Sequence, residues 1–287
     1  MSIRTDLALE QRELNPDITD GIESVEENIG DIKITRIIIK NSKGEKALGK
    51  PLGTYVTVEM PPLTDSGELN DDAVDAISKE LSEFLPKKGL VLVAGLGNTS
   101  ITPDAIGPKA ANGILATRHI EGEIARSIGL DDMRPVAVIA PGVLGQTGIE
   151  TGEIIAGIVE LIKPKAVIVI DALASRCLNR LGCTVQMSDA GICPGSGVGN
   201  SRAEISRRTV GVPVIAVGIP TVVDAVTLAQ DLTGHECSNT VNPRGAKMIV
   251  TPQEIDLLVS RGAGTVSRAI NCALQQSIDR ETLMALL

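Results

Sequence analysis

Two aspartates follow apolar runs that have the composition of buried strands. Asp104 comes after "GLVLVAGLGNTSITP", and Asp171 comes directly after "KAVIVI". A carboxylate at the end of a buried strand is costly to desolvate, so it needs a partner, a proton or a chemical role. If the two strands are neighbours, their carboxyl groups can share one pocket and one proton near neutral pH. One acid then activates water while the other polarises a peptide carbonyl, so the pair indicates peptide-bond hydrolysis without a cofactor.

Glycine-rich loops accompany both acids. "GLGN" precedes Asp104, and "PGVLGQTG" follows the next apolar run, "PVAVIA". Glycines let backbone N–H groups approach a substrate or the oxyanion of a tetrahedral intermediate. The candidate substrate or oxyanion contacts are Gly97, Asn98, Gly142, Gly145 and Gly148. As a nucleotide-binding signal "GLGN" is weak, because the third glycine and a later acidic strand end are both missing.

Each candidate also has a structural interpretation, and the sequence leaves these choices open. Asp104 can be the N-cap of the helix that follows, and Asp171 can be a strand-end acid bonded to loop backbone. Asp224 in "TVVDAV" is expected to be solvated or capping. Cys193 would be a nucleophile only beside a base, so we expect a buried or structural thiol. We expect His119 to be packed or ion-paired.

Composition narrows the class of protein. The 287 residues include 43% apolar residues but only one Tyr, one Phe and no Trp. A net charge of −9 without a basic cluster argues against nucleic acid and anionic membranes as partners. No apolar run reaches 18 residues and no signal peptide is evident, so we expect a cytoplasmic protein. Five cysteines at irregular spacings and two histidines predict neither disulfides nor a metal site.

Strands alternate with helices from residue 90 onward, and the strands are apolar on both faces. This pattern predicts a single α/β domain: a mostly parallel twisted sheet covered by helices on both faces, of the phosphorylase/hydrolase type. The acids then lie at the carboxyl ends of strands, where sheets of this class bind ligands.

The first residues and the last residues add elements to this sheet. Residues 1–30 are polar and predict an extended arm, whereas 31–40 and 53–60 predict an added N-terminal β-hairpin. A helix is expected over 71–84 behind a cap at Asn70. One or two closing helices are expected over 252–286, with a break at "GAG", residues 262–264.

Long motifs in order along nearly the whole chain carry a family resemblance. They include "RTDLALE", "GLGNTSITPDAIGPKA", "PGVLGQTGIETGEII", "IDALASR", "SDAGICPGSGVGNSR" and "PVIAVGIPTVVDAV". These stretches resemble the germination proteases of spore-forming Firmicutes. The resemblance implies an atypical aspartic endopeptidase, similar in fold to hydrogenase-maturation endopeptidases, that degrades small acid-soluble spore proteins in the spore core. It places the two essential aspartates at Asp104 and Asp171.

The resemblance also implies a self-processing zymogen and a homotetramer. The family's cleavage pattern is an acid, an apolar residue, Ala and a nearby Glu, which "TDLALE" matches. We therefore expect a cut between Asp6 and Leu7, with residues 1–6 as pro-segment and 7–287 as one peptidase domain. A six-residue pro-segment is shorter than the family's, and "GHECSNTVNPRGAKM" replaces an insert that the family usually carries.

Three rival functions stay open at this point. A metal-dependent endopeptidase of the maturation type would need a histidine near the acids, and only His119 is available. A non-catalytic protein could hold a nucleotide on the glycine loops. A thiol peptidase would use Cys193.

Overall fold

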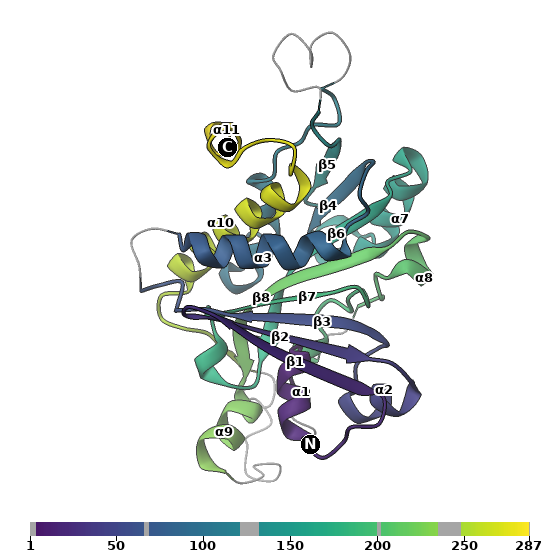
Figure 1. The fold of residues 1–287 in the computed structure, drawn as a ribbon. Helices are drawn as coiled ribbons and strands as arrows, with labels where there is room; N and C mark the ends of the chain where they lie inside the picture. The colour runs from purple at the N-terminus through teal and green to yellow at the C-terminus, as the bar shows by residue number, and fades with distance from the viewer. Residues whose placement is uncertain (1–3, 66–68, 121–131, 200–201, 235–247, 287) are drawn as a thin grey trace.

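The computed structural model describes residues 4–65, 69–120, 132–199, 202–234 and 248–286. These residues form one nine-stranded sheet with the order β1-β2-β3-β7-β8-β6-β4-β5, and β9 pairs with β8 (Figure 1). The strands are β1 (Ile22–Ile29), β2 (Ile32–Ile39), β3 (Gly53–Glu59), β4 (Val91–Gly95), β5 (Val136–Ile139), β6 (Ala166–Ser175), β7 (Thr184–Ser188), β8 (Val214–Asp224) and β9 (Ile249–Val250).

The central strands are parallel, as predicted. β5, β4, β6 and β8 pair in parallel, and β4, β6 and β8 are almost entirely buried. β7, β3, β2 and β1 extend the sheet beyond β8 as antiparallel strands. The expected α/β fold with a mostly parallel central sheet is therefore confirmed, and its antiparallel extension is as wide as the parallel part.

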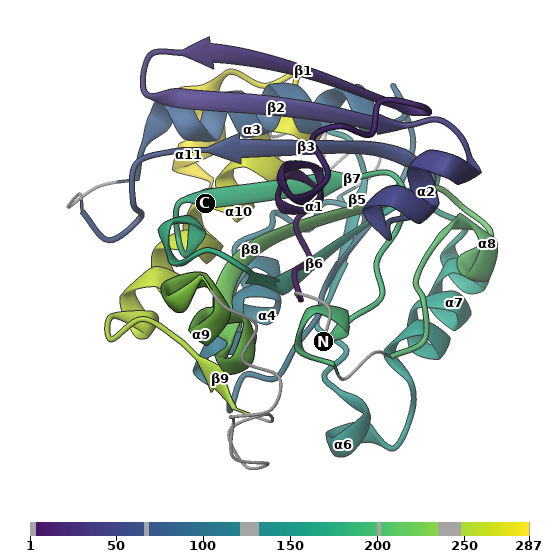
Figure 2. The same ribbon diagram turned by 90° about the horizontal axis from the view of Figure 1, so that it is seen from below.

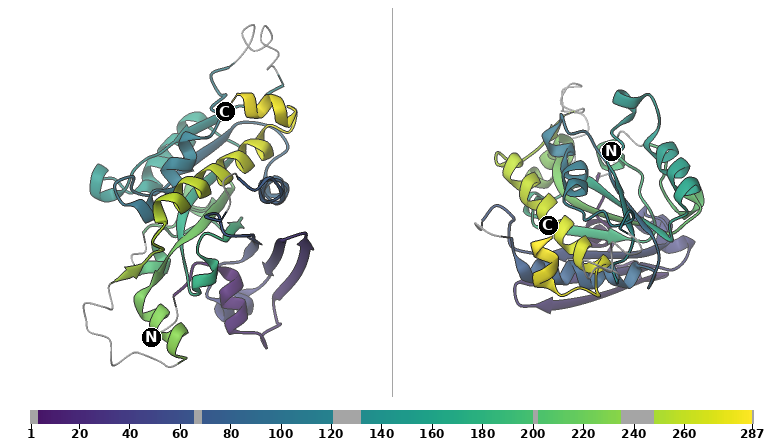
Figure 3. Two further views of the ribbon diagram at one scale, coloured as in Figure 1. Left: turned by 90° about the vertical axis from the view of Figure 1, so that its left-hand side faces the viewer. Right: turned by 90° about the horizontal axis from the view of Figure 1, so that it is seen from above.

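Helices cover both faces of the sheet. They are α1 (Ala8–Leu14), α2 (Ser42–Leu48), α3 (Asp71–Phe84), α4 (Ile106–Asn112), α6 (Leu144–Thr147), α7 (Thr151–Ile162), α8 (Arg207–Val210), α9 (Ala225–Thr233), α10 (Ile255–Leu274) and α11 (Arg280–Ala285). Three 3₁₀ turns are η1 (Thr102–Asp104), η2 (Leu178–Arg180) and η3 (Ser196–Val198). Residues of α3, α4 and α10 form the larger core on one face, and α7 and α8 pack on the other (Figure 3).

The predicted extended arm over residues 1–30 was wrong. α1 packs Ala8 and Leu9 against Ile37 and Tyr55 of the antiparallel strands, so tertiary contacts stabilise a helix too short to be stable alone. β1 is an edge strand whose residues after Ile22 are mostly exposed, so it carries no apolar alternation. The expected pairing of β2 with β3 is present, with α2 in the connection.

The C-terminal helix contradicts the expected break at its glycines. α10 runs unbroken through Gly262 and Gly264. A Cβ at Gly262 would lie 2.9 Å from Ile219 Cδ1 and 3.0 Å from Ile106 Cδ1, so this glycine allows the helix to approach the sheet closely. The cap of α3 is as predicted, since the Asn70 side chain accepts a hydrogen bond from Ala73 N. None of the helices among the described residues has the length and apolar character of a bilayer span.

Candidate active site

The two aspartates come from neighbouring parallel strands. Asp104 follows the carboxyl end of β4, whereas Asp171 lies within β6, which continues to Ser175 instead of ending at the acid as the sequence predicted. β4 and β6 pair in register, with Gly95 opposite Ile170, and Asp171 is the next residue of β6. After β4 the chain makes a short loop and reaches Asp104 at the end of η1. Both carboxyl groups line one cavity of about 390 Å³. The fold therefore brings the two sequence-predicted acids to one cleft.

Asp104 stabilises the glycine loop rather than the helix after it. Its Oδ2 accepts a hydrogen bond of 2.8 Å from Asn98 N. Gly97 has φ +116°, and a Cβ there would lie 2.0 Å from the Asp104 backbone oxygen. α4 begins after Ala105 without a side-chain cap, so the N-cap interpretation of Asp104 was wrong.

Asp171 is buried, with 5% of its surface exposed, and Ala172 N donates to its Oδ1 at 2.9 Å. Burial raises the pKa of Asp171 well above its usual value, and the charges of Asp104 and Asp6 raise that pKa further. Burial also raises the pKa of Asp104, against the hydrogen bond from Asn98 N. Two neighbouring carboxyl groups whose pKa values are both raised can share one proton near neutral pH.

The glycine-loop candidates divide into two groups. Gly97, Asn98 and Gly145 line the cavity, and a hydrogen bond of 2.9 Å from Gln146 Nε2 to Asn98 Oδ1 joins the two loops. Gly142 and Gly148 are not among the lining residues. They have φ values of +75° and +73° at the two ends of the α6 turn, so they shape the loop that carries Gly145.

The remaining candidate residues do not line the cavity that holds the two acids. Asp224 caps α9, since its Oδ1 accepts a hydrogen bond of 3.0 Å from Thr227 N, as the capping interpretation predicted. Cys193 is exposed, contrary to the expected buried thiol, and partial burial raises the pKa of its thiol, which disfavours the thiolate. His119 is exposed rather than packed and does not line the cavity.

Two further residues of the same types, His235 and Cys237, lie outside the described residues. Over the described part of the chain, no three His, Cys, Asp or Glu side chains gather as a metal site would require.

The N-terminal segment enters the same cleft, which the sequence alone did not predict. Asp6 lines the cavity together with Asp104 and Asp171. Asp6 N donates to Ala174 O at 2.8 Å, and Ala174 N donates to Asp6 Oδ2 at 2.9 Å, so the segment binds to the end of β6. The hydroxyl of Ser196 donates to Asp6 Oδ1 at 2.7 Å. In Figure 2 the chain from residue 4 onward runs past β6 into α1.

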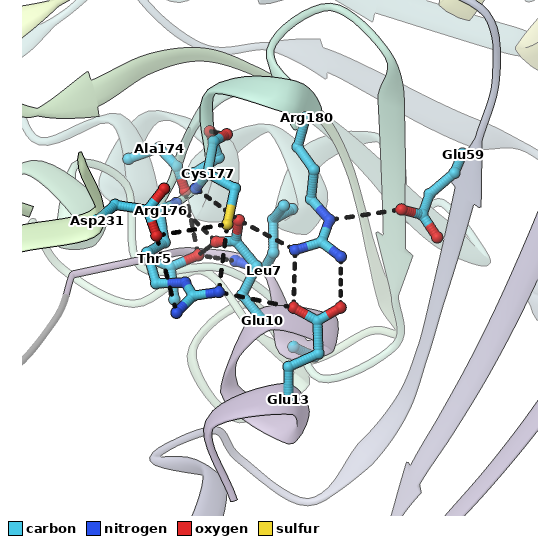
Figure 4. Close-up of polar contacts among 12 residues, drawn as sticks. Thr5, Leu7, Glu10, Glu13, Glu59, Ala174, Arg176, Cys177, Arg180 and Asp231 are labelled. Atoms are coloured by element: carbon cyan, nitrogen blue, oxygen red, sulfur yellow. Dashed lines mark hydrogen bonds and ion pairs between the residues drawn. The ribbon is translucent and has the colours of Figure 1, made fainter. Parts of the chain in front are cut away.

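A buried glutamate anchors this segment four residues later. Glu10 is 0% exposed, and its carboxylate accepts hydrogen bonds from Arg176 N at 2.7 Å and Cys177 N at 3.0 Å. The Arg180 guanidinium donates to Glu10 at 3.3 Å, and the Thr5 hydroxyl donates to it as well (Figure 4). A buried carboxylate with this many N–H and O–H donors is fully satisfied, so the docked position of residues 5–10 is specific.

The sequence matches one family of known proteins over most of its length. Residues 3–238 match the family described as Germination protease. The germination protease of Caldanaerobacter subterraneus subsp. tengcongensis is 43% identical over 320 residues, which cover 100% of this chain and 98% of that protein. That of Clostridium perfringens is 42% identical, covering 98% of each. That of Priestia megaterium is 35% identical, covering 99% of this chain and 96% of that protein.

One solved structure is also similar, the [NiFe] hydrogenase maturation protease HycI of Thermococcus kodakarensis. It is 16% identical with a TM-score of 0.38, and the match covers 67% of this chain and 98% of that one. The sequence matches extend over nearly the whole chain, and the family match covers the segment that holds both acids. The chain therefore belongs to the germination protease family.

Proposed function

We propose that this protein is an endopeptidase that degrades small acid-soluble spore proteins during germination, with Asp104 and Asp171 activating the attacking water. The observation that carries the proposal is the single cavity lined by both acids and by Asp6. Family membership supports the peptidase activity and the substrate class.

The two acids have different environments and therefore different roles. Asp171 is the more deeply buried, and the negative charge of Asp104 favours its protonated form. Asp104 is partly exposed and receives an N–H from Asn98, which favours its ionised form. Asp104 takes a proton from water as the water oxygen attacks the peptide carbon, and Asp171 donates a hydrogen bond to the carbonyl oxygen. The proton on Asp104 then passes to the leaving nitrogen as the C–N bond breaks.

The same site would process the protein's own N-terminus. The predicted cut between Asp6 and Leu7 lies on a segment that is already bound in the cleft, with Asp6 beside the two acids. Release of residues 1–6 would leave 7–287 as the mature peptidase domain. Spore proteins that carry a similar stretch of acid, apolar residue, Ala and Glu would then bind where this segment lies.

Asparagine variants test the assignment of the two acids. Asp104→Asn and Asp171→Asn should each lower the cleavage of a small acid-soluble spore protein by at least about 1,000-fold. Asn at position 104 cannot take the proton of water, and Asn at position 171 is a much weaker donor to the developing oxyanion than a carboxylic acid and cannot share a proton with Asp104. Asp189→Asn is the matched control, since Asp189 accepts a hydrogen bond from Thr54 N and lines neither the cavity nor the docked segment. Retention of more than a tenth of the activity by either site variant would contradict the dyad.

The position of the cut and its metal dependence complete the test. We expect mass spectrometry of the wild-type chain to find a new N-terminus at Leu7, and we expect cleavage to continue in the presence of a chelator. Activity that a chelator removes and an added divalent metal restores would favour the metal-dependent alternative.

A further inference from the structure

One polar side chain, Gln186, interrupts the apolar centre of β7. Its neighbours Val185 and Met187 belong to the main core, whereas Gln186 points to the opposite face and is 8% exposed. A buried primary amide is costly unless its donors and its acceptor are satisfied. Both of its groups are satisfied by the N-terminal segment.

The Gln186 amide contacts the backbone on both sides of one residue, Leu7. Its Nε2 donates to Asp6 O at 3.0 Å, and its Oε1 accepts from Ala8 N at 2.6 Å. The orientation of the amide is determined by these partners, because the reverse one would face oxygen to oxygen and N–H to N–H. The contacted Asp6 oxygen belongs to the Asp6–Leu7 peptide group, where the proposed function places the cut, and the contacted Ala8 N–H belongs to the next peptide group.

The sheet register places Gln186 in line with the candidate catalytic acid. Asp171 of β6 pairs with Gly218 of β8, and Gly218 pairs with Gln186 of β7. Side chains in one row of a sheet share a face, so the acid and the amide lie on either side of a position that has no side chain. A Cβ at Gly218 would lie 2.6 Å from Leu173 Cγ, so the packing of Leu173 requires a glycine at this position.

The N-terminal segment crosses this glycine position. Asp6 bonds to β6 through its N–H, which donates to Ala174 O, and to β7 through its carbonyl, which accepts from Gln186. β8 lies between these two strands. Asp6 also lines both the cavity of the acids and a neighbouring cavity of about 330 Å³ that Gln186 and Gly218 line. Asp6 therefore reaches from the cavity of the acids to Gln186, which donates to its carbonyl.

We propose that Gln186 is the residue that holds the substrate backbone on both sides of the residue after the scissile bond and stabilises the oxyanion on the carbonyl that is attacked. This inference rests on the proposed function, because it takes Asp6–Leu7 as the bond that is cut. As the water oxygen bonds to the Asp6 carbonyl carbon, negative charge develops on the oxygen that already accepts from Nε2. Because both hydrogen bonds of the Gln186 amide go to backbone atoms, it can hold any peptide that binds in this register, including the spore-protein substrate.

Two substitutions distinguish the role of the Gln186 donor, Nε2, from that of its acceptor, Oε1. Gln186→Met keeps the volume and removes both hydrogen bonds, whereas Gln186→Glu keeps an acceptor for the second N–H but cannot donate to the carbonyl when ionised. We expect each to lower kcat on the order of 100-fold, with a smaller change in KM. The substrate is a peptide with the sequence RTDLALEQREL of residues 4–14, and the full-length chain is the enzyme.

Thr184→Val is the matched control. Thr184 lies two residues away on the same face of β7, it is buried, and its hydroxyl has no hydrogen-bond partner among the described residues. Its replacement should leave kcat unchanged. Urea denaturation of all three variants reports whether they are folded.

A modified peptide supplies a readout that a merely structural role would not change. N-methylation of the alanine at the position of Ala8 removes the N–H that Gln186 Oε1 accepts. It should reduce kcat/KM for the wild type by about 10-fold and cause no further loss in Gln186→Met, as expected of two groups that interact. A kcat for folded Gln186→Met within threefold of the wild type, or an equal effect of N-methylation in both proteins, would overturn the inference. Failure of the wild type to cut the Asp–Leu bond would instead overturn the proposed function.

Discussion

Two glutamates on α1 allow a direct test of how the N-terminal segment is held. Glu10 and Glu13 are three residues apart, and both contact Arg180. Glu10 is 0% exposed, whereas the Glu13 side chain is 41% exposed. The substitutions Glu10→Ala and Glu13→Ala therefore remove the same chemical group from the same helix at two different depths.

The two substitutions should differ several-fold in the free energy by which they weaken the docking of α1. Glu10→Ala leaves the N–H groups of Arg176 and Cys177 without their acceptor and leaves Arg180 beside a cavity, and breaking such a buried charged network costs about 3–5 kcal/mol. Glu13→Ala removes an ion pair whose acidic side chain is 41% exposed, and leaves Arg180 its contacts with Glu10 and Glu59, so it should cost about 1 kcal/mol or less. We expect the helix to undock much more often in the first variant than in the second.

Hydrogen exchange of the α1 amides measures this difference. A loss of about 3 kcal/mol corresponds to exchange on the order of 100-fold faster, and a loss of about 1 kcal/mol to roughly fivefold. Both variants are made on the Asp171→Asn background, so that self-processing cannot release the segment during the measurement. Equal exchange rates in the two variants, or faster exchange in Glu13→Ala, would refute the anchoring role of the buried glutamate.

The raised pKa of Asp171 and the conformation of the glycine loop lead to two more predictions. Because the folded chain binds the Asp171 proton more tightly than the unfolded chain does, wild-type stability falls as pH rises from the ordinary carboxyl pKa through the raised one. Asp171→Asn should therefore unfold at higher urea concentration than the wild type at pH 8 and at a similar concentration near pH 4; no gain at pH 8 would contradict the burial argument. Gly97→Ala should destabilise the fold by about 2 kcal/mol or more, because its Cβ would overlap the Asp104 carbonyl at positive φ. Gly145→Ala, which lines the same cavity with open space around its Cβ, should change the thermal midpoint little, and similar shifts for both would show that the Gly97 conformation is not required.

The pattern of apolar residues along the sequence was sufficient to predict the parallel part of the sheet. Strands buried on both faces are apolar almost throughout, so β4, β6 and β8 are evident as apolar runs, and an acid that follows such a run is conspicuous. The continuation of β6 from Asp171 to Ser175 was not evident, because the acid interrupts its apolar run. Edge strand β1 and helix α1 were missed, because an exposed edge needs no apolar alternation and a short helix depends on tertiary contacts. The glycines of α10 were misjudged for a similar reason, since their effect depends on how close a neighbouring strand lies.

By itself the sequence determined that Asp104 and Asp171 each follow an apolar run, and that a parallel sheet would bring the ends of such runs to one edge. Only the tertiary structure decided that β4 and β6 are neighbours, and that Asp6 lines the cavity of the two acids. The partners of Glu10 and Gln186 also depend on it, because these contacts join residues more than 160 positions apart. Hydrophobic periodicity encodes which face of an element is buried, but it carries no information about which distant polar groups will meet there.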